Sequence, residues 1–200
     1  MRRPAEPRSD DPYDLAVVPR SSTVAGYVTL VAAFGLMTVH YFGGTEGDPE
    51  GWFSSVGFGA PFVGVGLMAV VGGQFVRPTL SVAAGAALGP MSVVSVAMWP
   101  LLIAAVFLFL PVGTVRRGDP ILVPMACAAA LVAVFGYLVF HQDPVTWVTP
   151  TGGGGSSNIV TVAEASISLV VTGLVVVGAV VWARRPPASP GPVAGPSGAW

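Results

Sequence analysis

Long apolar runs alternate with short polar segments along the chain. Four runs have the length of a helix that crosses the ~30 Å hydrocarbon core of a bilayer. They cover residues 23–42, 54–76, 120–140 and 159–182. Lipid offers the backbone no hydrogen-bond partners, and a helix satisfies its amides internally. The pattern therefore predicts an all-α integral membrane protein, a small bundle of full transmembrane spans.

A fifth apolar stretch, residues 79–114, has a length that fits neither one comfortable helix nor two full spans with a turn. Helix breakers interrupt it at Gly89-Pro90 and at Pro100. We expect a broken or re-entrant helical hairpin with its tip near residues 92–100, so that four spans plus two hairpin arms make six helical segments. The alternative is one long kinked helix, which gives five spans and places the C-terminus outside.

The distribution of charge favours the hairpin. Arginines that flank a span stay on the cytoplasmic side of a membrane. If residues 79–114 double back, every arginine lies on one side, and the arginine-free loops at 43–53 and 141–158 lie on the other. A single crossing would leave Arg116, Arg117, Arg184 and Arg185 outside. We therefore expect a multi-pass protein of the cell (plasma) membrane with both termini in the cytoplasm.

The composition supports this interpretation and excludes other classes. Only 10% of the residues are charged and 53% are hydrophobic, whereas a soluble domain carries about a quarter charged residues. The net charge of −1 provides no basic surface for nucleic acid. All basic residues are arginine, and Ala, Gly, Val and Pro are abundant, which is typical of a GC-rich bacterial genome.

The polar ends and the second loop are expected to lack stable structure. Residues 1–22 and 183–200 are rich in proline and have no hydrophobic periodicity, so we expect disordered cytoplasmic tails. The C-terminal tail contains Pro187-x-x-Pro190, a spacing that fits polyproline ligands but is common in such a composition. The run at residues 152–157, GGGGSS, lacks the Lys-Ser/Thr of a phosphate-binding loop and is predicted to be a flexible extracellular linker.

Glu164 is the first candidate for chemistry. We expect it about two turns inside the last span, where an ionised carboxylate is costly unless it is paired or hydrated. Thr161 lies three residues before it, and Ser168 and Thr172 lie four and eight residues after it, so all four share one face of a helix. This polar stripe should point into the bundle. The functional interpretation is a proton or cation site. The structural one is a protonated or water-reached glutamate near the outer headgroups.

His40 and His141 are the second candidates, because our topology places both at the outer ends of their spans, near the level of Glu164. Two imidazoles and a carboxylate at one depth could bind a transition metal or form a pH-sensitive cluster. No H-x-x-x-H spacing connects them, so two interfacial histidines that never meet are the simpler interpretation. We predict no metal and no cofactor.

Several small-residue pairs predict close helix packing. Gly85 and Gly89 form a GxxxG pair, with Ser81 on the same face, and the second span contains the pairs Ala60/Gly64 and Ala69/Gly73. Such faces let helix backbones approach each other, either within one chain or between chains. Cys127 lies alone in an apolar run and is interpreted as a small packing residue.

Two functions are compatible with these features. The chain lacks a G-x-S-x-G elbow, an H-E-x-x-H helix and paired intramembrane aspartates, so we expect no enzyme. The first hypothesis is a non-enzymatic accessory or structural membrane subunit, with the lipid bilayer and another membrane protein, or a second copy, as partners through the small-residue faces. The alternative is a small transporter or channel for a proton, cation or small solute, using Glu164 and the broken hairpin.

Overall fold

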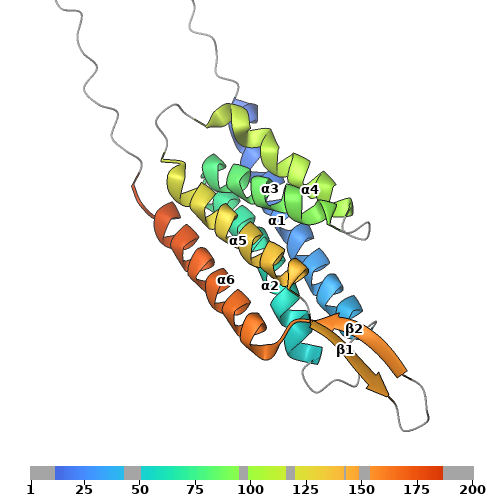
Figure 1. The fold of residues 1–200 in the computed structure, drawn as a ribbon. Helices are drawn as coiled ribbons and strands as arrows, with labels where there is room; N and C mark the ends of the chain where they lie inside the picture. Colours follow the sequence, from blue (N-terminus) through green and yellow to red (C-terminus); the bar gives the residue numbers. More distant parts are fainter. Residues whose placement is uncertain are drawn as a thin grey trace, which may run out of the picture.

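The described part of the protein is a helical bundle with a β-hairpin at one end (Figure 1). The structure is a computed structural model that describes residues 12–42, 51–94, 99–115, 120–141, 143–148 and 154–186, without the side chains of 12–19, 143–148 and 154–159. Its α-helices are α1 Pro12–His40, α2 Gly51–Gln74, α3 Pro78–Val93, α4 Pro100–Phe109, α5 Leu122–Phe140 and α6 Val162–Ala183. The 3-10 helix η3, Leu110–Thr114, continues α4, and the strands are β1 Asp143–Val148 and β2 Gly154–Ile159.

Within the described ranges, four helices are long and apolar enough to cross a membrane, as predicted. They are Arg20–His40 within α1, and the whole of α2, α5 and α6. Their ends agree with the predicted spans to within a few residues. Helix α1 extends further back, to Pro12, so the predicted tail at residues 1–22 is partly helical. Proline is a favourable first residue of a helix because its missing N–H would have no partner there.

The stretch at residues 79–114 folds as two helices, α3 and α4, that pack against each other and run in opposite directions (Figure 1). Pro100 begins α4 as a helix breaker should. Pro90 instead lies inside α3, which continues to Val93. A Cβ on Gly85 would lie 3.1 Å from Leu108 Cβ, so Gly85 is where the two helices meet. The long kinked helix of the five-span alternative is therefore not the fold of this stretch.

The loop at residues 141–158 contains the run 152–157 that we predicted to be a flexible linker, and the part of this run that the structure describes is a β-strand instead. Strands β1 and β2 pair antiparallel, with Asp143 opposite Ile159 and Val148 opposite Gly154. The hairpin lies beyond the end of the bundle (Figure 1). The run Val145–Val148 consists of β-branched and aromatic residues that favour strands, and it pairs with the glycine- and serine-rich segment that we expected to be unstructured.

Helix α2 is the centre of the bundle and packs against α1, α3, α5 and α6. Glycines make these approaches possible. A Cβ on Gly57 would lie 2.6 Å from the Cα of Ala165 in α6, and a Cβ on Gly66 would lie 3.1 Å from the carbonyl oxygen of Gly26 in α1. Gly64, one of the predicted small residues, lies against Leu131 and Thr172. The small-residue faces of α2 and α3 are therefore used for packing within the chain, except at Gly89, where a Cβ would meet nothing within 4 Å.

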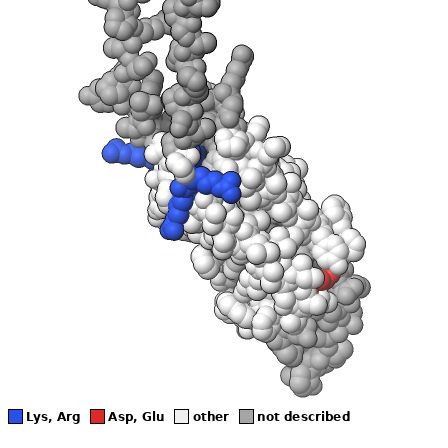
Figure 2. Space-filling view, turned by 90° about the vertical axis from the view of Figure 1, so that its left-hand side faces the viewer, with Lys and Arg blue, Asp and Glu red and all other residues white. Residues whose placement is uncertain are grey.

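The two ends of the bundle differ in charge. Arg77, in the α2–α3 turn, donates from Nε to the carbonyl oxygen of Ala183 (3.2 Å) and from Nη2 to that of Arg185. Its guanidinium also lies 5.5 Å from the ring centroid of Trp182. Figure 2 shows that the arginines whose side chains the structure describes lie at this end, and that the acidic side chain it describes, Glu164, lies near the other end. We call the two ends the arginine end and the Glu164 end.

Candidate functional site

Glu164 lies in the first turn of α6, and not two turns inside it as predicted, because β2 occupies residues up to Ile159 and the helix begins only at Val162. Its Oε2 accepts hydrogen bonds from the backbone N–H and the hydroxyl of Thr161, both at 3.0 Å. Thr161 Oγ1 in turn accepts from the backbone N–H of Glu164 (3.3 Å). This reciprocal pair is a capping box, which satisfies helix N–H groups that have no partner within the helix.

Ser168 points into the bundle as predicted and is fully buried against α2. Its hydroxyl donates to the carbonyl oxygen of Gly57 at 2.8 Å. In a helix that carbonyl would accept from the N–H of residue 61, but residue 61 is Pro61, which has no N–H. Ser168 therefore replaces the donor that proline removes, a known way of accommodating proline in spans.

Thr172, one turn further along α6, is also buried, and its Oγ1 has no hydrogen-bond partner among the described residues. The predicted stripe of Glu164, Ser168 and Thr172 thus exists on one side of α6, but its members face different environments. The glutamate caps the helix, the serine serves the α2 backbone, and the threonine packs beside Gly64. These three side chains therefore have separate contacts in the part of the chain that the structure describes.

His40 is bound to the start of α2. Its Nδ1 lies 3.0 Å from Ser55 Oγ, and the Ser55 hydroxyl donates to the carbonyl oxygen of Gly51 at 2.9 Å. While the Ser55 hydroxyl donates to Gly51, it accepts from His40 in the tautomer that carries a proton on Nδ1. The imidazole also stacks on Phe58 with a centroid distance of 5.5 Å.

His141 follows α5 and is exposed. Its Nδ1 lies 3.2 Å from the carbonyl oxygen of Tyr137, and its ring stacks on that of Tyr137 at 4.4 Å. No group of three His, Cys, Asp or Glu side chains in the described residues could hold a metal ion. The structure therefore does not gather His40, His141 and Glu164 into a metal site.

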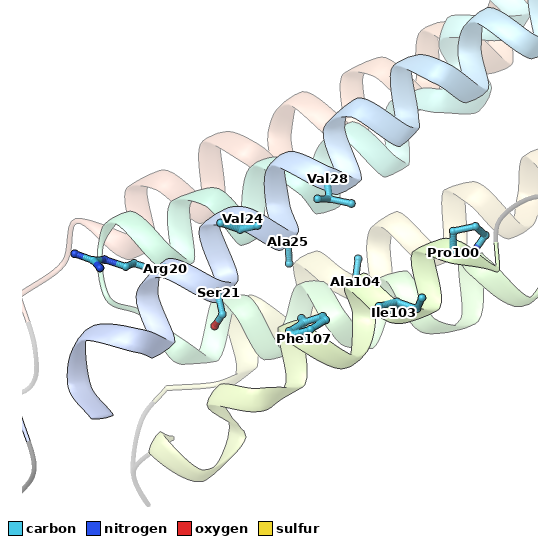
Figure 3. Close-up of a pocket in the computed structure, with 9 residues that line it drawn as sticks. All are labelled: Arg20, Ser21, Val24, Ala25, Val28, Pro100, Ile103, Ala104 and Phe107. Carbon is cyan, nitrogen blue, oxygen red and sulfur yellow. The ribbon is translucent and has the colours of Figure 1, made fainter. Parts of the chain in front are cut away.

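Two features were not foreseen from the sequence. One is the pair of hydrogen bonds from Arg77 to the end of α6. From the sequence, an arginine at the end of a span indicated only which side of the membrane that end faces. The other is an open groove of about 590 Å³ between α1 and α4, lined mostly by apolar side chains and reaching Ser21 and Arg20 at the arginine end (Figure 3). The pairing of a short helix with α1 could not be derived from hydropathy alone.

Comparison with known proteins identifies no relative from which a function could be inferred. No protein-family model matches the chain, and neither a curated protein nor a solved structure matches it. The arrangement of polar side chains is thus the basis for any functional conclusion. Those on α6 and at the start of α2 stabilise helix ends and a proline-containing helix.

Proposed function

We propose that the chain is a multi-pass subunit of a cell membrane, with its arginine end in the cytoplasm, whose role is to pack against another helical membrane protein or a second copy of itself. The observation that carries this proposal is the outer face of α5. Ala126, Ala129 and Ala133 are exposed there, and a Cβ on Gly136 would meet nothing within 4 Å. Small residues at such spacing let a second helix approach closely in lipid.

The ends of this face are shaped differently from its middle. Leu122 and Phe140, which are 83% and 84% exposed, stand at the two ends of α5. The side chains between them on this face, at residues 126, 129, 133 and 136, are no larger than a methyl group. Since lipid tails solvate leucine as well as alanine, small side chains favour a helical neighbour through closer dispersion contact.

The hydrogen bonds of α6 also support an accessory role over transport. A transporter would be expected to aim Glu164 and Ser168 into one water-accessible path. Glu164 is instead bonded to Thr161, and Ser168 to the α2 backbone. The alternative of proton or cation transport predicts that Glu164→Gln abolishes flux into vesicles that contain the purified chain, whereas an accessory subunit gives no flux with either residue.

The association itself can be tested with two glycines that both face open space. The chain should be expressed in its own host and extracted from the membrane with a mild detergent. It should then migrate as a complex larger than a monomer in native electrophoresis. Gly136→Leu, on the α5 face, should reduce that complex to the monomer. Gly173→Leu, on the exposed side of α6, should leave it intact. A monomeric parent, or equal behaviour of both variants, would contradict the proposal.

A further inference from the structure

The groove between α1 and α4 is lined by apolar side chains, except at the end where Ser21 and Arg20 lie (Figure 3). Ala25 of α1 and Ala104 of α4, each 5% exposed, point toward each other across its floor. The larger side chains of Val24, Ile103 and Phe107 stand beside them and are 61%, 64% and 48% exposed. The groove is thus open on the outside of the bundle, where an inserted chain meets lipid.

The groove has the length of a lipid tail within one leaflet. It runs along α1 from Arg20 to Val28, which is ~12 Å at 1.5 Å per residue. That is most of the ~15 Å that half of a ~30 Å hydrocarbon core provides. Its volume of about 590 Å³ lies within the usual range of ligand-binding clefts, about 300–1,000 Å³.

The mouth of the groove carries positive charge. Arg20 is exposed and lines the end of the groove, with its guanidinium pointing away from the apolar side chains (Figure 3). This is the geometry in which arginine covers apolar surface with its stem and places its charge at headgroup level. Arg77, Arg184 and Arg185 lie at the same end, whereas Glu164, the acid whose side chain the structure describes, lies at the other (Figure 2).

We infer that this groove binds one acyl chain of an anionic phospholipid of the arginine-side leaflet, with the lipid phosphate at Arg20. The apolar walls select a hydrocarbon chain, and a guanidinium can donate two parallel hydrogen bonds to a phosphate. A zwitterionic lipid offers the same tail but carries a second, positive charge near the arginines. The inference rests on the proposed membrane placement but not on the association through α5.

The test uses the full chain in vesicles that contain phosphatidylglycerol or phosphatidylcholine with a photoreactive group near the end of one acyl chain. We expect cross-links to concentrate at residues 24–28 of α1 and 103–107 of α4. We also expect a preference of about fivefold for phosphatidylglycerol at equal mole fraction, equivalent to ~1 kcal/mol per arginine at a membrane surface. Arg20→Gln should remove most of this preference, whereas Arg184→Gln, the same charge change outside the groove, should retain it.

A second pair of variants tests the groove independently of charge. Ile103→Trp fills the groove and should abolish the concentrated cross-links, while Ile167→Trp, on the exposed side of α6, should not. Cross-links spread evenly over the helices, or equal labelling by both lipids, would overturn the inference. Release of the chain by alkaline washing would overturn the membrane placement as well, whereas a retained chain without lipid preference would overturn only this inference.

Discussion

Helices α2 and α5 are both apolar enough to cross a membrane, yet they occupy opposite environments in the bundle. Helix α5 has the higher mean hydropathy, 2.3 against 1.8, but only 28% of the residues in its apolar stretch are buried, against 72% in that of α2. The more hydrophobic helix therefore lies on the outside. Because lipid solvates apolar side chains as well as a protein core does, hydrophobicity cannot sort helices within a membrane. What places α2 at the centre is its glycines, which let neighbouring helices approach closely, and Pro61, which leaves a carbonyl that a serine hydroxyl of α6 satisfies.

The largest expected effect is at Gly57. An added Cβ would lie 2.6 Å from both Cα and Cβ of Ala165, so backbone must move. Gly57→Ala should lower the free energy of unfolding by about 3 kcal/mol, the upper part of the range for overpacked cores. Gly136→Ala on α5, which meets no atom, should leave it unchanged or raised. Thermal unfolding of the purified chain in detergent measures both, and equal losses would remove the distinction between the helices.

Ser54 should come next. Its hydroxyl accepts a hydrogen bond from the buried backbone N–H of Val160 at 2.9 Å, which ties the junction of β2 and α6 to the start of α2. Ser54→Ala leaves that N–H without a partner and should cost about 2 kcal/mol of unfolding free energy. Ser166→Ala is the matched control, since Ser166 is exposed and bonds only within α6 to the carbonyl of Val162. A loss at Ser166 as large as that at Ser54 would contradict the proposed tie.

Ser168 gives a smaller effect with a specific signature. Ser168→Ala should cost about 1 kcal/mol, within the range measured for hydrogen bonds between membrane helices. If the serine replaces the donor that Pro61 removes, the cost should nearly vanish in a Pro61→Ala background, because the N–H of residue 61 can then serve Gly57. Unfolding of the four chains in a double-mutant cycle gives the coupling energy. Additive losses would show that the two residues act separately.

The smallest expected effect is a gain. Thr172 buries a hydroxyl without a partner, and valine has nearly the same shape without the oxygen. Thr172→Val should raise the free energy of unfolding by about 0.5–1 kcal/mol, the lower end of the cost of an unsatisfied hydroxyl. The same unfolding measurement would count against this account if Thr172→Val were less stable than the parent chain.

The sequence predicted the helical elements well because each depends on local properties. Continuous apolar length identified the four long helices, and Pro100 marked the start of α4. The predicted depth of Glu164 was wrong because β2 extends to Ile159, where the predicted span began, and strand pairing leaves no periodic signal in a short glycine-rich segment. Pro90 does not end α3, because a helix can continue past a proline when its neighbours compensate.

The roles of the polar residues were harder to predict than their directions. The stripe on α6 was expected to face the bundle, and Ser168 and Thr172 do. The partner of Ser168, however, is a carbonyl that lacks a donor because of a proline on another helix, a relation invisible until α2 and α6 are placed side by side. The groove beside α1 likewise depends on how a short helix packs, which hydropathy does not specify.

The hydrogen bond between Ser168 and Gly57 joins residues 111 positions apart. Because synthesis proceeds from the N-terminus, the carbonyl of Gly57 is made long before its donor. Helix α2 therefore carries one backbone acceptor without a partner until α6 has been synthesised and has packed beside it. A truncated product that ended before α6 would keep this carbonyl bare, which distinguishes it chemically from a chain that contains Ser168.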